Sequence, residues 1–304
     1  MSTIAKFLIG LERFSSGLSS HETQVEDHHI AYLEGGQGDP ILLLHGFGAS
    51  GDSWTRFAKP LTKSHRVIAP DLPGWGRSTR LEKASYGYPA QVERVHKLVQ
   101  RLGLSRFHLV GHSMGGFIAS AYAATYPKEV STLGLLCAHG VDGAEESELM
   151  RSVAKGDNWL VASSLEGFNR LLGKLFVKQP YTPKIVLHYL AQSAVRNCRQ
   201  SQEIFDAMQS NNPPLVEMLP KIQAPTLVIW GDKDMLIHVS CAEVFKKKIP
   251  SAQVRVLPET GHMPLLEHVQ EAISAYASFL ESAGAPAAQS TRDSGEKTPQ
   301  KVMA

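Results

Sequence analysis

The chain has 304 residues, of which 43% are hydrophobic and 20% charged, and its formal net charge is +2 at pH 7. This length fits one large α/β domain with an insertion or two small domains, and the composition excludes a disordered chain or a membrane bundle. The near-neutral balance gives no global electrostatic field of either sign, so nucleic acid is not an expected partner. Three widely spaced cysteines form no CxxC pair, which argues against a disulfide framework or a cysteine zinc site.

Apolar residues recur at helical spacing near the N-terminus, at Ile4, Phe7, Leu8, Leu11 and Phe14. They predict an amphipathic helix within residues 1–22, which packs on the core or on a partner, or lies on a membrane surface through residues 4–14. No stretch reaches the roughly 18 to 20 apolar residues that span a bilayer, and no clear signal-peptide cleavage site follows. The expected localisation is therefore cytoplasmic or peripheral at the inner membrane face.

Short apolar strands then alternate with longer helical segments. The predicted strands are 30–33, 41–44, 66–69, 107–110, 130–137, 226–230 and 254–257, and the predicted helices include 89–102, 117–126 and 264–280. This alternation predicts an α/β fold, a mostly parallel central sheet with helices on both faces. Residues 140–212 contain helical runs without a convincing strand and predict an inserted helical cap between core segments 23–139 and 213–282. The polar composition of 283–304 predicts a disordered tail.

Gly111-His112-Ser113-Met114-Gly115 lies between a predicted strand and a predicted helix. A G-x-S-x-G motif in this context indicates a nucleophile elbow, a sharp turn that exposes the serine and needs very small residues on either side. Ser113 is therefore the candidate nucleophile. The helix that follows also directs free N–H groups toward the site, where they can stabilise an oxyanion.

A second turn, His45-Gly46-Phe47-Gly48, follows the buried strand 41–44. The backbone N–H groups of Phe47 and Met114 are the candidate oxyanion donors. His45 is interpreted mainly as a hydrogen-bonding residue that holds this loop, with substrate contact as the alternative, and His112 as a support for the site. The turn 71–78, rich in glycine and proline, is expected to pack rigidly nearby.

A nucleophilic serine requires a base and an acid. With a G-x-S-x-G elbow, the usual order along the chain is serine, then Asp or Glu, then His, so both partners are expected downstream of Ser113. Asp234 follows the strand 226–230, and His262 follows the strand 254–257. Both lie at carboxyl ends of predicted strands, where open α/β sheets form their sites. Asp234 is the candidate acid and His262 the candidate base, while Asp232 is the competing acid, interpreted as a turn residue. No metal-ligand spacing and no nucleotide-binding loop is present, so neither a metal nor a cofactor is expected.

Five motifs in order, HGFGAS, DLPGWGRS, GHSMGG, PTLVIWGDKD and ETGHMPLLE, resemble those of the α/β-hydrolase superfamily over residues 24–282. Three longer segments are similar to monoacylglycerol lipases of the α/β-hydrolase-domain type and related bacterial lipases. These are VERVHKLVQRLGLSRFHLVGHSMGG, APTLVIWGDKD and LVASSLEGFNRLLGKLFVKQPYTPKIVLHYL. The resemblance implies a serine esterase or lipase with triad Ser113, Asp234 and His262, acting on a small-molecule or lipid ester. It also implies a cap over an acyl pocket, for which Phe168 and Leu172 are candidate contacts.

Other members of that superfamily leave alternatives open. Carbon–carbon bond hydrolases and a menaquinone-pathway lyase share the serine triad but handle anionic substrates, which favour arginines converging on the pocket. The cap here offers Arg170, Arg196 and Arg199 among many leucines. A non-catalytic receptor on the same scaffold is a third alternative, which an esterase assay distinguishes.

Overall fold

A computed structural model describes residues 2–210 and 212–284, and its strands form one sheet in the order β1-β2-β4-β3-β5-β6-β7-β8. The strands are β1 (Ser19–Val25), β2 (His28–Gly35), β3 (Pro40–Leu44), β4 (Arg66–Pro70), β5 (Phe107–His112), β6 (Val130–Leu136), β7 (Thr226–Gly231) and β8 (Ala252–Leu257). Pairs β1–β2 and β2–β4 are antiparallel, and every pair from β4 to β8 is parallel. This confirms the mostly parallel sheet predicted from the sequence.

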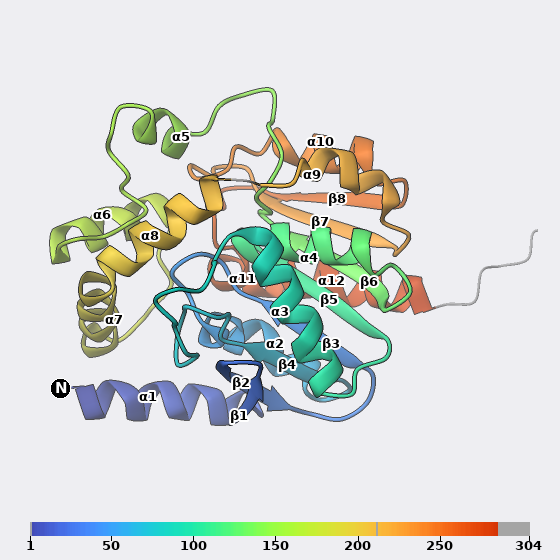
Figure 1. Cartoon of the computed structure of the whole chain (residues 1–304), viewed down its shortest axis with the longest axis horizontal. Helices are drawn as coiled ribbons and strands as arrows, with labels where there is room; N and C mark the ends of the chain where they lie inside the picture. The colour runs from blue at the N-terminus through green and yellow to red at the C-terminus, as the bar shows by residue number, and fades with distance from the viewer. Residues whose placement is uncertain (1, 211, 285–304) are drawn as a thin grey trace, which may run out of the picture.

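Helices cover both faces of the sheet (Figure 1). They are α1 (Ser2–Ser15), α2 (Thr55–Leu61), α3 (Tyr88–Arg101), α4 (Met114–Thr125), α5 (Glu148–Val153), α6 (Leu165–Leu175), α7 (Lys184–Arg196), α8 (Cys198–Gln209), α9 (Leu215–Met218), α10 (Cys241–Lys248), α11 (Pro264–Glu267) and α12 (Val269–Gly284), with short 3₁₀ helices at Gly51–Trp54 and Leu219–Lys221. Side chains of α3, α4 and α10 join one core cluster, and those of α2 and α12 join another. The sheet therefore separates two apolar layers.

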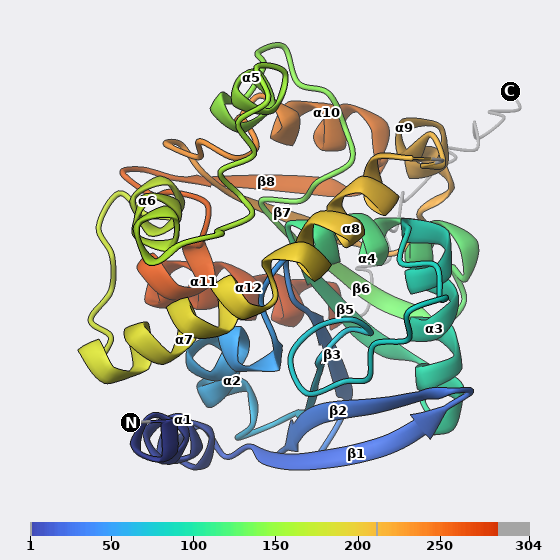
Figure 2. The ribbon, with the colours of Figure 1, turned by 60° about the vertical axis from the view of Figure 1, so that its left-hand side comes forward.

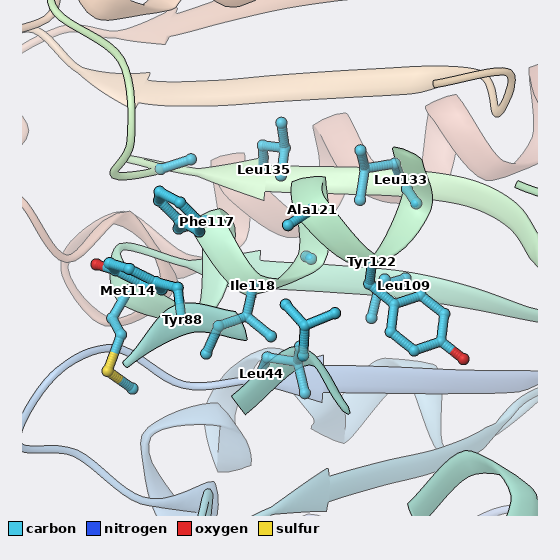
Figure 3. Close-up of a cluster of buried hydrophobic side chains, with 14 of the residues drawn as sticks. Leu44, Tyr88, Leu109, Met114, Phe117, Ile118, Ala121, Tyr122, Leu133 and Leu135 are labelled. Carbon is cyan, nitrogen blue, oxygen red and sulfur yellow. The ribbon is translucent and has the colours of Figure 1, made fainter. Parts of the chain in front are cut away.

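Strand β3 illustrates why continuous apolar runs form the central strands. Leu42 and Leu44 pack into the cluster under α4, whereas Ile41 and Leu43 pack into the cluster under α2 and α12. Successive side chains of a strand point to opposite faces, so a strand covered on both sides needs apolar residues at every position. Figure 3 shows Leu44 with side chains of α4 and of strands β5 and β6 in the first of these layers.

Helices α5 to α8 occupy the segment expected to form a helical cap, and they lie beside one end of the sheet (Figures 1 and 2). We call these four helices and their connections the cap. Helix α1 contacts both α7 and α2, so the N-terminal helix lies against the cap as well as the core.

Three sequence expectations differ from the structure at their boundaries. The N-terminal helix ends at Ser15 rather than near residue 22, and β1 begins at Ser19. The last predicted helix is divided at His268, whose backbone leaves the helical region at φ −122° and ψ 52°. Residues 283 and 284 complete α12, while the rest of the predicted tail lies outside the described residues. Among the helices described, none has the length and apolarity needed to cross a membrane.

Candidate active site

Ser113 stands at the turn between β5 and α4, with φ 52° and ψ −118°. A Cβ added to Gly111 would lie 2.2 Å from the Gly115 carbonyl oxygen, and one added to Gly115 would lie 2.2 Å from the Leu44 carbonyl oxygen. Side chains are therefore excluded at both positions by backbone atoms, as the motif indicated. A positive φ on a serine is costly, and such strain is concentrated at functional sites.

Asp234 and His262 form a buried pair at the ends of β7 and β8. The His262 Nδ1 lies 2.8 Å from Asp234 Oδ2, and both side chains are almost fully buried. The other carboxylate oxygen, Oδ1, accepts the backbone N–H groups of Leu236 at 2.9 Å and Ile237 at 3.0 Å. These contacts hold the Asp234 carboxylate in place, and it fixes the ring orientation of His262 with Nδ1 facing it.

Asp232, the competing acid, has different partners. Its Oδ1 accepts the Thr260 backbone N–H at 3.3 Å, and its Oδ2 lies 3.3 Å from Lys233 Nζ. The carboxylate thus connects the loop after β7 to the loop after β8. This arrangement agrees with its interpretation as a residue that pins the turn.

The loop after β3 approaches the serine closely, since a Cβ on Gly46 would lie 3.1 Å from Ser113 Cβ. Phe47 and Met114, the candidate oxyanion donors, both line the same cavity as Ser113. The Met114 N–H belongs to the first residue of α4 and has no acceptor within the helix. The Met114 N–H is therefore available to a ligand next to the serine, and Phe47 lies in the same cavity wall.

His45 does not lie in that cavity lining, which corrects its assignment as a substrate contact. Its Nε2 accepts the Leu72 backbone N–H at 2.9 Å, and its Nδ1 lies 2.7 Å from the Gly46 carbonyl oxygen. Both ring nitrogens are thus occupied by the backbone. Burial lowers the pKa of His45 and keeps the ring neutral in this role.

His112 and Cys137 surround the histidine–aspartate pair. His112 Nε2 donates to the His262 carbonyl oxygen at 2.8 Å, and burial lowers the pKa of His112 to about 3. Ligand atoms of Cys137, Asp234 and His262 lie within 4.8 Å of one another, a potential metal site in the described part of the chain. Asp234 already holds one His262 nitrogen, and burial raises the pKa of the Cys137 thiol well above its usual value, which opposes the thiolate that a metal would need. The residues therefore fit an acid–base pair better than a metal centre.

The site opens into one cavity of about 1640 Å³, lined by Ser113, His262, the core loops and the cap. Phe168 and Leu172 of α6, the predicted pocket residues, both line it. Phe168 also packs against Ala162 and Ala191 within the cap, so it contributes to cap stability. Leu172 is only partly buried, and it is not a member of that packed cluster of buried residues.

Four arginines line the cavity, and each is paired with a carboxylate. The pairs are Arg13–Asp52, Arg56–Glu12, Arg77–Asp71 and Arg80–Glu203. Arg170, Arg196 and Arg199, the cap arginines, do not line the cavity, and Arg170 and Arg199 are paired with Asp157 and Glu203. This neutralised wall differs from the converging free guanidinium groups that anionic substrates would favour.

No local sequence pattern indicates two other parts of the cavity wall. Ile9, Glu12 and Arg13 of α1 line it, so the N-terminal helix closes one side. Tyr88 and His139 also line it and hydrogen-bond to each other. Their proximity depends on how α3 and the loop after β6 meet, which no local pattern encodes.

Comparison with known proteins shows similarity to one fold family and to several lipases. Residues 39–269 match the family model described as the alpha/beta hydrolase fold. Lipase 1 of Psychrobacter immobilis is 36% identical over 277 residues, 90% of this chain and 87% of that protein. The monoacylglycerol lipase abhd6-A of Xenopus laevis is 33% identical over 256 residues, 80% of this chain and 75% of that protein. A crystal structure of a membrane phospholipase A is 41% identical with a TM-score of 0.91, covering 92% of this chain and 91% of that one.

Proposed function

The chain belongs to the α/β-hydrolase fold family and is a carboxylic-ester hydrolase, and from this premise we propose that Ser113 is its nucleophile, His262 its base and Asp234 its acid. The observation that carries the proposal is the buried His262–Asp234 pair, held at 2.8 Å, in which His262 lines the same cavity as Ser113. The strained turn at Ser113 supports the same assignment.

In the proposed mechanism His262 Nε2 takes the Ser113 hydroxyl proton while Oγ attacks the ester carbonyl. The backbone N–H groups of Phe47 and Met114 stabilise the resulting oxyanion. The tetrahedral intermediate collapses, its C–O bond breaks, and His262 returns the proton to the departing alcohol. Water then hydrolyses the acyl-enzyme by the same proton transfers, and Asp234 stabilises the imidazolium in each half-reaction.

The proposed substrates are acyl esters of the monoacylglycerol type. Leu172, Leu175, Val186 and Leu190 of the cap line the cavity and offer apolar contacts for an acyl chain. A covering cap limits width more than length, so one chain enters more easily than three. We expect kcat/KM on monoacylglycerols and medium-chain p-nitrophenyl esters to exceed that on long-chain triacylglycerols.

The test combines that substrate series with covalent labelling. A fluorophosphonate should label the wild-type protein at Ser113, and Ser113→Ala should abolish the label and lower ester turnover by about 10⁴- to 10⁶-fold. A label that persists on another serine of the variant would refute the nucleophile. Absence of both label and turnover in the wild type would favour a non-catalytic receptor.

We also propose that α1 contacts a lipid surface. Ile4, Phe7, Leu11 and Phe14 share one helix face and are strongly exposed, Phe14 at 82%. The opposite face lines the cavity, and the pairs Arg13–Asp52 and Glu12–Arg56 fasten the helix to the core. Docking of this face would bring the substrate cavity close to the membrane.

Vesicle co-sedimentation tests the contact. Phe7→Glu with Phe14→Glu should greatly reduce sedimentation with phosphatidylglycerol-containing vesicles while turnover of a water-soluble short-chain ester stays unchanged. Val256→Glu changes an exposed apolar residue on β8 and provides the matched control. Unaltered sedimentation of the α1 variant would refute this contact.

A further inference from the structure

A histidine–tyrosine pair stands in the cavity wall without a part in the proposed reaction. The Tyr88 hydroxyl lies 3.0 Å from Nδ1 of His139, and both residues line the cavity that contains Ser113. One explanation of the pair is that it supports the loop after β6, and the other is that it contacts the substrate. The geometry of the pair and the chemistry of the free ring nitrogen distinguish these two explanations.

The position of His139 is fixed relative to the nucleophile. Its backbone N–H donates to the Ser113 carbonyl oxygen at 3.0 Å, so the loop after β6 is joined directly to the turn at the serine. The next residue, Gly140, has φ 116°, and a Cβ there would lie 2.4 Å from Phe117. The backbone on both sides of the ring is therefore held in place.

Stacking fixes the orientation of the two rings. Tyr88 stacks on Phe117 with centroids 3.7 Å apart, and His139 lies nearly parallel to Tyr88 with an interplanar angle of 14°. Figure 3 shows Tyr88 beside Phe117 and Met114, at the start of α4. The hydrogen bond between Tyr88 and Nδ1 of His139 then leaves the Nε2 edge of the imidazole free.

That free edge carries Nε2, for which the described residues provide no hydrogen-bond partner. Burial lowers the pKa of His139 to about 4, so the ring is neutral at the pH of ester hydrolysis. In a neutral imidazole Nε2 either donates or accepts, depending on the direction of the bond to Tyr88. A hydroxyl group can satisfy either state because it both donates and accepts, whereas an ester alkyl group satisfies neither.

We propose that His139, oriented by Tyr88, is a subsite for a free hydroxyl group on the alcohol part of the ester. This inference rests on the proposed function and deepens it. The apolar cap residues accommodate the acyl chain, and His139 selects esters of polyols, such as glycerol, over esters of simple alkanols. Neither residue transfers a proton in the reaction.

Two esters with the same acyl group test the subsite, monodecanoylglycerol with free hydroxyls and methyl decanoate without them. His139→Leu should lower kcat/KM on monodecanoylglycerol by about 5- to 10-fold, the effect of one hydrogen bond, and change the methyl ester by less than about twofold. His139→Gln, whose amide nitrogen can occupy the place of Nε2, should restore part of the glycerol ester activity. Tyr88→Phe should give a smaller loss with the same selectivity.

His96→Leu is the matched control, since His96 also bonds to a tyrosine hydroxyl, Tyr122 at 3.2 Å, but lies outside the cavity lining. It should affect both esters alike. Equal losses on the two esters in His139→Leu, or no loss on either, would overturn the subsite while leaving the proposed function intact. A wild-type protein inactive on both esters would contradict the proposed function itself.

Discussion

At the scale of single residues, the two acidic side chains after β7 differ in what their oxygens contact. Asp234 directs Oδ2 to His262 and Oδ1 to two backbone N–H groups, and it is 5% exposed. Asp232 bonds to Thr260 and Lys233 in the neighbouring loop. Asp234 can therefore orient the histidine, whereas Asp232, two positions earlier in the chain, holds a turn.

This difference predicts the outcome of amide substitutions. Asp234→Asn should lower kcat by about 10⁴-fold, because an amide cannot both accept from Nδ1 and satisfy the backbone donors with the correct imidazole tautomer. Asp232→Asn keeps an acceptor for Thr260 and should lower kcat by less than about tenfold. Steady-state kinetics on a p-nitrophenyl ester measures both effects, and a reversed order would mean that the acid is misassigned.

At the scale of elements, a residue of the cap can stabilise the cap by packing or contact the substrate, and the two roles need different tests. Helix α6 carries Phe168, which packs within the cap at 8% exposure, and Leu172, which is partly buried in the cavity wall. A charged group at Phe168 should lower both the melting temperature and the activity. Leu172 is therefore the sharper probe of an acyl pocket.

Leu172→Asp should lower kcat/KM on decanoate esters by about tenfold more than on acetate esters, roughly the contribution of two buried methylenes. The same substitution at Leu165, on the same helix but 46% exposed and outside the cavity lining, provides the control. Chain-length profiles and melting temperatures measured on both variants decide the question. A uniform loss across chain lengths, together with a lower melting temperature, would mean that Leu172 only packs the cap.

At the scale of the whole molecule, the elements that the sequence predicted well are those whose environment is encoded locally. The apolar runs of β3, β5 and β7 are buried on both sides, and the turn at Ser113 follows from close backbone contacts. Strand β1 was missed because Ser19–Val25 is largely polar and exposed, and its pairing with β2 defines it as a strand. The part of α1 in the cavity wall and the Tyr88–His139 pair were missed because both arise from tertiary contacts between distant segments.

Burial of neutral histidines also affects the stability of the whole fold. His112 is 2% exposed, and burial, assisted by the neighbouring His262, lowers its pKa from 6.5 to about 3 in the folded state. The pKa of His139 is lowered to about 4, also mainly by burial. Below pH 6.5 the unfolded chain binds protons that the folded chain does not, so the free energy of unfolding falls as the pH decreases from about 6.5 toward 3.

For His112 alone this linkage amounts to about 2 kcal/mol between pH 7 and pH 5. His112→Gln keeps a side-chain amide that can donate to the His262 carbonyl oxygen but does not titrate, so its unfolding free energy should fall by about 2 kcal/mol less over that interval. Urea unfolding at the two pH values measures the difference, with His21→Gln, the same substitution at an exposed histidine of β1, as the matched control. Parallel losses of stability in wild type and His112→Gln would mean that His112 is not a buried neutral residue. The acid sensitivity of the fold would then have to arise at other groups.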